Sequence, residues 1–198
     1  VTIALPEGLV PIIAAKTTET TFLPLPETSL GEFSSSAVER LRLGLVDYDA
    51  LLLGCGIGLS SSAKRLIERL LLLDELEIPI VVDADALNIL SWNDEWWKKF
   101  TKEAILTPHA GEMSRLTGYT VDYVQKNRLS VTLESAKKWN KVIVLKGAFT
   151  VIACPNGFAT ISPFTNAGLA TAGTGDVLAG VIVGLLSQGV TLRDAAVI

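Results

Sequence analysis

A glycine-rich segment that runs into an apolar helix carries the clearest chemistry of the sequence. The segment is NAGLATAGTGDVLAG, residues 166–180. Gly173 and Gly175 allow the backbone to adopt positive φ and to approach a ligand with no Cβ in the way. The first turn of a helix has unpaired N–H donors and a positive dipole end. We therefore expect Gly173, Thr174 and Gly175 to form an anion hole that suits a phosphate.

Asp176 is the unusual member of this segment, because a bound phosphate repels a carboxylate. It makes chemical sense as the group that acts on whatever attacks the phosphate. A structural alternative has Thr174 as the N-cap and Asp176 as an acid that favours the helix dipole. Capping needs one special residue, whereas Gly168, Gly173 and Gly175 cost backbone entropy that capping does not require. The pattern favours an anion site with a catalytic carboxylate.

Composition narrows the class of protein. A chain of 198 residues, 49% of them hydrophobic, suffices for one α/β domain over residues 1–198 with a substantial core. The net charge of −4 has no basic block behind it, which argues against nucleic acid or an anionic membrane as the main partner. Cys55 and Cys154 are far apart in apolar settings, as is typical of free thiols in a reducing, cytoplasmic compartment. No apolar run is long enough to predict a membrane span.

Both ends of the sequence lie within predicted elements. The chain begins in the strand-like VTIA and stops at DAAVI, inside a helix that starts near Thr191. We expect a fragment that lacks the first elements of its domain and the end of its last helix.

Apolar runs rich in Val, Ile and Leu alternate with helical patterns along the chain. Such runs are typical of parallel strands covered on both faces. The sequence therefore predicts a three-layer, doubly wound α/β fold with a mostly parallel sheet, and ligands outside the carboxyl ends of its strands. Residues 149–163 add two short strands around a Pro-Asn-Gly turn, which predict an antiparallel hairpin at the sheet edge. The predicted strands are 1–4, 50–54, 78–85, 104–107 and 141–147, and the predicted helices are 7–15, 34–43, 60–74, 111–117, 121–139 and 174–188.

Two further motifs follow predicted strands. GCGIG, residues 54–58, has Leu59 where a dinucleotide fingerprint needs its third glycine, and it lacks the GK[ST] of a Walker A loop. We expect a flexible turn with N–H groups at a helix start that binds an anion or a close-packed ligand, in preference to a purely structural turn. In VVDADALNIL, Asp85 is most simply the N-cap of a helix over 86–90. Asp83 could hold a metal-bound water or orient another group, and its role is left open.

The only histidine and a strand-end lysine complete the candidate site. His109 follows Pro108 at the end of a strand, which favours a place in the site, although Thr107 or His109 could also cap the helix that starts at Gly111. No second histidine or paired thiol supports zinc. Lys146 closes the strand VIVL and is followed by Gly147, so its ammonium can meet a phosphate in a cleft.

In combination these motifs resemble one family, the ADP- or ATP-dependent NAD(P)H-hydrate dehydratases, which have a ribokinase-like fold. The most specific matches are N-x-G-L-A-x-A-G-T-G-D-V-L at 166–178 and TPHxGE at 107–112, with DADALN and LKGAFT beside them. The resemblance covers nearly all 198 residues. It implies that hydrated NADH or NADPH is phosphorylated on its ring hydroxyl by ADP or ATP, and that phosphate is then eliminated to restore the dihydronicotinamide.

The resemblance also implies roles for individual residues. Gly58, His109 and Asp176 would contact the hydrate, with Asp176 as the catalytic base. The adenine nucleotide would be lined by Lys146, Gly147, Ala148, Phe149, Thr150 and Gly175. Mg²⁺ on the phosphates is implied by the chemistry and the family, and no ligand set in the sequence identifies its site. Cys55 and Ala110 stand where the family usually has proline.

Partners and alternatives follow from the same motifs. The resemblance implies work alongside an NAD(P)H-hydrate epimerase, and we expect a homo-oligomer. A GTGD motif alone also fits a kinase of the same fold for a thiazole or pyridoxal-like vitamin precursor. A noncatalytic nucleotide-binding module is the third possibility, suggested by the apparent loss of elements at both ends.

Overall fold

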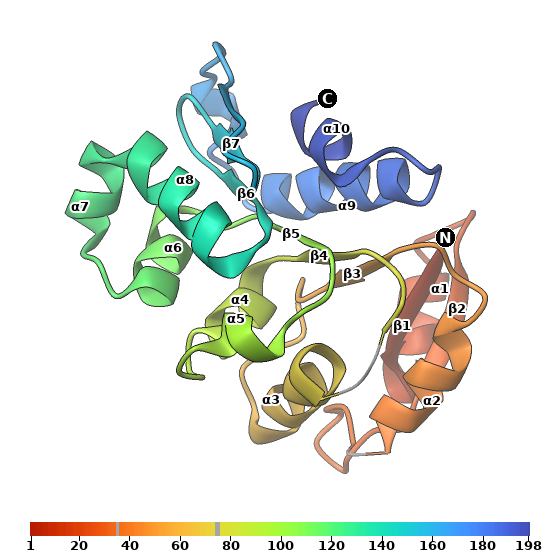
Figure 1. The fold of residues 1–198 in the computed structure, drawn as a ribbon. Coiled ribbons are helices and arrows are strands. Elements are labelled where there is room, and N and C mark those ends of the chain that lie inside the picture. The colour runs from red at the N-terminus through yellow and green to blue at the C-terminus, as the bar shows by residue number, and fades with distance from the viewer. Residues whose placement is uncertain (35, 74–75) are drawn as a thin grey trace.

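A six-stranded sheet forms the centre of the molecule in the computed structural model, which describes residues 1–34, 36–73 and 76–198 (Figure 1). Its strands pair in the order β3-β4-β5-β6-β7-β8, parallel from β3 to β6 and antiparallel from β6 to β8. The predicted, mostly parallel sheet and its late edge hairpin are therefore confirmed. The bounds are β3 Leu51–Leu53, β4 Ile80–Val82, β5 Ala104–Leu106, β6 Val142–Leu145, β7 Val151–Ala153 and β8 Ala159–Ile161.

Alternate residues of the buried strands face two separate clusters of apolar side chains, which gives the three layers. On β4, Ile80 and Val82 belong to the core under α3, α4, α6 and α8, whereas Val81 faces α9 and α10. Figure 1 shows α9 and α10 on one side of the sheet and α3, α4 and α5 on the opposite side, with α1 and α2 beside β1 and β2. Because every parallel strand is covered on both faces, its sequence is a continuous apolar run rather than an alternating one.

Most predicted helices are present, with shifted ends. The predicted helix over 121–139 is wrong as one element, because the chain breaks at Asn127 into two helices. The helix predicted over 60–74 begins at Ser61 and continues as a π-helix over Arg69–Leu73. Residue 74 of this prediction and residue 35 of the helix predicted over 34–43 lie outside the described residues. The helices are α1 Val10–Ala14, α2 Ala37–Leu45, α3 Ser61–Glu68, α4 Ala84–Leu90, α5 Trp96–Lys99, α6 Ala110–Thr117, α7 Val121–Lys126, α8 Arg128–Trp139, α9 Thr174–Leu186 and α10 Leu192–Val197.

The first strand does not join the main sheet. β1 (Thr2–Pro6) pairs in parallel with β2 (Thr21–Leu25), and the two form a small sheet of their own. β2 was not predicted, because its sequence TFLPL contains Pro24, and proline is rare within strands. Proline is tolerated in an edge strand, and both strands of a two-stranded sheet are edge strands. Among the described residues, no helix is long and apolar enough to cross a membrane.

Candidate active site

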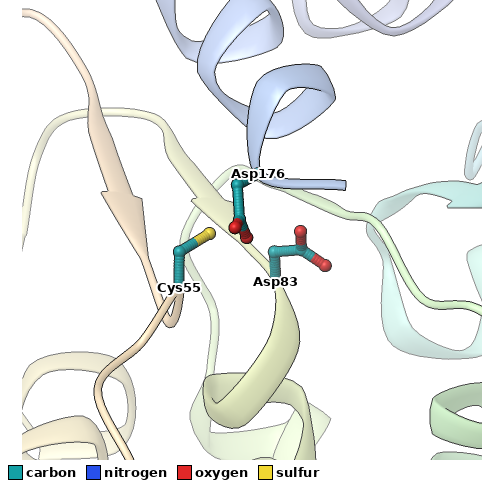
Figure 2. Close-up of side chains that lie close together, drawn as sticks. All are labelled: Cys55, Asp83 and Asp176. Atoms are coloured by element: carbon teal, nitrogen blue, oxygen red, sulfur yellow. The ribbon is translucent and has the colours of Figure 1, made fainter. Parts of the chain in front are cut away.

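The carboxyl ends of the parallel strands and the first turn of α9 meet at one edge of the sheet. Cys55 follows β3, Asp83 follows β4, and Asp176 lies in the first turn of α9. One ligand atom from each of these side chains lies within 4.8 Å of the other two (Figure 2). Residues 28 and 93 positions apart are thereby brought to the strand-end edge, where an open α/β sheet binds its ligands.

A short ion pair connects two of the strand ends. The Nζ atom of Lys146, after β6, donates to Asp83 Oδ1 at 2.6 Å. Asp83 is only 1% exposed, so its charge is stabilised by this partner rather than by water. A Cβ built on Gly175 would lie 3.3 Å from the same Nζ, which puts the ammonium beside the glycine loop. The sequence left Asp83 open, and the structure assigns it the task of holding Lys146.

The backbone at Asp83 depends on a glycine in the neighbouring strand end. Gly54 has φ of +126°, and a Cβ there would lie 1.9 Å from the carbonyl oxygen of Asp83. Ala84, the first residue of α4, has φ of 51°, in the left-handed region that disfavours side chains by about 1 kcal/mol. Close packing and local strain thus set the direction in which the Asp83 side chain leaves the strand.

The predicted cap of this helix is wrong by two residues. α4 starts at Ala84 with Asp83 as its N-cap residue, and Asp85 lies within the first turn. The Asp85 carboxylate instead accepts from the backbone N–H of Gly58 at 2.9 Å, across to the GCGIG loop. That loop connects β3 to α3, whose N-cap residue is Ser60, so the predicted turn between a strand and a helix is present. Its binding of an anion stays a prediction. The Gly58 N–H is thus occupied by a carboxylate, and the residue itself is exposed.

Asp176 and Cys55 are directly coupled. Burial, the charge of Asp83 and a hydrogen bond to Asp176 raise the pKa of the Cys55 thiol to about 12, so this thiol stays protonated at neutral pH. In Figure 2 the thiol points toward the Asp176 carboxylate, and the Asp83 carboxylate turns away from it. A protonated thiol is a donor to Asp176 and not a competing nucleophile. Cys55 was missed as a site residue because its sequence setting indicated only a buried apolar thiol.

The glycine loop begins α9 without a side-chain cap. Gly173 is the N-cap residue, with φ of 90°, and Thr174 is the first helical residue, so the alternative with Thr174 as N-cap is contradicted. The Thr174 hydroxyl donates to the carbonyls of Leu169 and Thr171, both at 2.9 Å, and so fastens the loop from within. Among the described residues no side chain caps these first-turn N–H groups, so they are available to an anion, and Asp176 lies in the same turn.

His109 caps the helix α6, and about half of its side chain is exposed. Its Nδ1 accepts from the N–H groups of Gly111 and Glu112, and the Glu112 carboxylate accepts from the His109 N–H at 2.8 Å, a capping box at the start of α6. Of the two predicted caps, His109 is therefore the one used, and the hydroxyl of the buried Thr107 donates to the carbonyl of Val82. Burial and the charge of Lys146 lower the pKa of His109, so the ring is neutral and its Nδ1 stays an acceptor. Half of the side chain remains exposed toward solvent.

The predicted nucleotide loop, residues 146–150, is an irregular turn between β6 and β7. Gly147 has φ of 138° and Phe149 has φ of 54°, and the Thr150 hydroxyl donates to the Gly147 carbonyl at 3.0 Å. The backbone N–H of Lys146 donates to the carbonyl of Pro108 at 2.8 Å, which fastens this loop to the segment that carries His109. Gly147, Ala148 and Phe149 are exposed, so their surfaces are open to a ligand.

The two carboxylates of the cluster are suited to Mg²⁺. Asp83 and Asp176 offer hard oxygen ligands of the type that Mg²⁺ takes together with substrate phosphates. This donor set is thus compatible with the magnesium that a nucleotide brings with it.

A hollow lies at the opposite end of the sheet, near the amino ends of β4 and β5, and its charge does not suit a nucleotide. It encloses about 660 Å³, and its lining includes Asp49, Glu77 and Glu103. Three carboxylates repel polyphosphate, whereas the strand-end edge has Lys146 and a helix N-terminus. The charge of the strand-end edge is therefore the better match for a phosphate.

The fold and this edge define a class of protein, the ribokinase-like α/β proteins. A family model for NAD(P)H-hydrate dehydratase matches residues 2–198. The chain therefore belongs to the NAD(P)H-hydrate dehydratase family, and the resemblance seen in the sequence is confirmed.

Relatives with assigned names agree with this family. The chain is 43% identical over 196 residues to a bifunctional NAD(P)H-hydrate repair enzyme of Moorella thermoacetica, with 99% of the chain and 37% of the relative covered. It is 41% identical over 152 residues to an ADP-dependent (S)-NAD(P)H-hydrate dehydratase of Neisseria meningitidis, with 76% of the chain and 51% of the relative covered. The chain thus spans between about a third and a half of these relatives.

Solved structures share the fold. An ADP/ATP-dependent NAD(P)H-hydrate dehydratase of Bacillus subtilis, co-crystallised with ATP and Mg²⁺, is 31% identical with a TM-score of 0.76, and the match covers 99% of this chain and 64% of that one. A hydroxyethylthiazole kinase of Pyrococcus horikoshii is 17% identical with a TM-score of 0.63, over 98% of this chain and 73% of that one, a likeness of fold alone.

Proposed function

We propose that this chain carries the active site of an ADP- or ATP-dependent NAD(P)H-hydrate dehydratase, a hydro-lyase that returns hydrated NADH or NADPH to the reduced dinucleotide. The observation that carries the proposal is the position of Asp176, in the first turn of α9, beside the Asp83–Lys146 ion pair. A carboxylate, a cation and free helix N–H groups at one edge are the parts that phosphoryl transfer to a hydroxyl requires.

Asp176 is the general base in this mechanism. It accepts the proton of the ring hydroxyl as the O–P bond forms, and it does not need to remove that proton beforehand. The protonated thiol of Cys55 points toward the same carboxylate and does not compete with it as a nucleophile. The hydrate lies against Gly58 and the exposed face of His109, with its hydroxyl directed at Asp176.

The nucleotide lies on the other side of Asp176. Its adenosine part contacts the loop Lys146–Thr150, and the transferring phosphoryl group meets the N–H groups of Gly173, Thr174 and Gly175. Lys146 neutralises developing charge there, since its ammonium lies beside Gly175. Mg²⁺ held by Asp83 and Asp176 would add charge neutralisation on the phosphates when it is bound. Loss of the phosphate with the neighbouring proton then restores the ring.

We also propose the domain, the partner enzyme and the compartment in which this activity takes place. Residues 1–198 act as a single catalytic domain, and the hydrate reaches it as the correct epimer from an NAD(P)H-hydrate epimerase. The bifunctional name of the Moorella relative supports such a partnership. The free thiols Cys55 and Cys154 support a reducing, cytoplasmic compartment, and we expect a homo-oligomer.

A direct assay tests the proposal. The protein is incubated with hydrated NADH or NADPH, Mg²⁺ and either ADP or ATP, and recovery of the absorbance band of reduced nicotinamide is followed together with phosphate release. Recovery that depends on nucleotide supports the dehydratase. A stable phosphorylated alcohol formed from a thiazole or pyridoxal-like substrate, with no recovery from the hydrate, would replace it by a vitamin kinase.

A further inference from the structure

Arg128 lies directly under the loop to which we assign the nucleotide. α8 begins at this residue because the chain breaks at Asn127. The Nη2 atom donates to the carbonyl of Leu145 at 2.7 Å and to that of Lys146 at 3.3 Å. A Cβ built on Gly147 would lie 3.3 Å from both Nη atoms. The guanidinium therefore lies against the backbone at the point where β6 ends and the loop begins.

The position of Arg128 is unfavourable for a residue with a merely structural task. A cation in the first turn of a helix opposes the helix dipole. Among the described residues no carboxylate pairs with Arg128, and burial lowers the pKa of its guanidinium. Its buried Nε atom has no hydrogen-bond partner within that part of the chain. The unfavourable helix position, the half-buried charge without a carboxylate partner and the Nε atom without a hydrogen bond together indicate a functional constraint on Arg128.

The loop above Arg128 is the part of the site with the least regular backbone. Gly147 and Phe149 both have positive φ. Arg128 makes two of the contacts that define where this loop starts, and Gln125 holds the other side of the guanidinium through a 3.0 Å hydrogen bond to Nη1. An anionic ligand on the loop would supply the negative charge that the protein does not.

We propose that Arg128 is a positioning residue for the adenine nucleotide: its guanidinium fixes the backbone of Leu145–Gly147, and its unpaired charge strengthens the binding of the anionic ligand on that loop. The proposal rests on the proposed function, since it takes residues 146–150 as the nucleotide site. It assigns a task to a side chain that the sequence motifs do not include.

Binding of ADP with Mg²⁺, measured by titration calorimetry without the hydrate, tests the proposal separately from catalysis. Arg128→Met keeps the aliphatic stem and loses the charge and the donors, and we expect it to weaken binding roughly 10- to 100-fold, as for lost hydrogen bonds from a charged group. Arg128→Lys keeps the charge without the planar fork and should fall between Met and the original residue. At saturating nucleotide, kcat should stay within about threefold, because Asp176 is untouched.

Two further variants keep the test decisive if Arg128→Met fails to fold. Gln125→Ala removes an exposed support of the guanidinium and should weaken ADP binding about two- to threefold without unfolding the chain. Arg69→Met is the matched control, since Arg69 pairs with Glu39 on exposed surface in another part of the fold, and it should leave ADP binding unchanged.

The outcomes separate the two proposals. Folded Arg128→Met and Arg128→Lys variants that bind ADP within twofold of the original protein, with only a lower melting temperature, would show a merely structural role and overturn the proposal. Unchanged ADP binding in Gln125→Ala together with an unfolded Arg128→Met would overturn it as well. Failure of the unaltered protein to bind ADP or ATP would remove the proposed function, and the role of Arg128 with it.

Discussion

The Nζ atom of Lys146 donates to Asp83 Oδ1 at 2.6 Å, although the two residues are 63 positions apart in the chain. This pair connects the carboxyl ends of β4 and β6, two strands with β5 between them. It holds the lysine ammonium beside Gly175 at the start of α9. The ion pair therefore connects the start of the loop 146–150 with the start of α9, which carries Asp176.

Replacement of Lys146 should lower stability more than replacement of Asp83. Lys146→Met leaves the charge of Asp83 buried and unpaired, which should lower the free energy of unfolding by about 3 kcal/mol. Asp83→Asn leaves Lys146, which is more exposed and can turn toward water, so we expect a loss of about 1 kcal/mol. Urea unfolding measures both, with Lys98→Met in the exposed Lys98–Glu95 pair as control. Equal losses in the two site variants would contradict this account of the pair.

Gly54 should be intolerant of any side chain. Gly54→Ala forces a Cβ into the carbonyl of Asp83 at positive φ, and we expect a loss of about 3 kcal/mol or more in the free energy of unfolding, with displacement of Asp83. Gly56 is the matched control, because it has positive φ and open space around its Cα, so Gly56→Ala should cost only about 1 kcal/mol. Similar losses at the two positions would mean that backbone conformation, and not the contact with Asp83, sets the cost.

The two tasks of His109 should be separable. Asparagine is a good N-cap, so His109→Asn should keep the melting temperature close to that of the original protein, whereas His109→Ala should lose about 1 kcal/mol. Both variants lose the exposed ring face, and both should raise the KM for the hydrate while the KM for nucleotide stays unchanged. An unchanged hydrate KM in His109→Asn would restrict His109 to the capping box.

The buried Lys141 should make stability rise with pH on the alkaline side. Burial lowers its pKa to about 8 from an ordinary value near 10.5, so between these values the unfolded chain binds more protons than the folded chain. The free energy of unfolding should therefore increase from pH 8 to 10.5, by up to about 3 kcal/mol, relative to Lys141→Met. Denaturant unfolding of the two proteins at several pH values checks this, and parallel pH profiles would contradict it.

Much of the fold was predictable because apolar runs such as IPIVV and KVIVL identify buried parallel strands without reference to the rest of the chain. The sequence did not indicate β2, where Pro24 lies in a separate two-stranded sheet, or the break at Asn127, which has no glycine or proline to signal it. Propensity and periodicity report on local structure, and both misses depend on tertiary context.

The sequence motifs of the candidate site could be predicted one by one, but the contacts between residues of different motifs could not. The glycine loop, Asp176 and the segment after β6 each carry their own signature. The ion pair between Asp83 and Lys146 and the contact of Cys55 with Asp176 depend on strand order, which no single motif contains. Asp85 was misplaced as a cap because α4 begins two residues earlier, at an alanine with positive φ that sequence patterns disfavour.

The role of Asp176 is the central claim, and steady-state kinetics of Asp176→Asn with hydrated NADH test it most directly. Asparagine keeps the shape and cannot accept the proton, so kcat should fall roughly a hundredfold or more while ADP binding stays within a few-fold of the original. A near-normal kcat in this variant would contradict the account and leave Asp176 as an acid that only stabilises the first turn of α9.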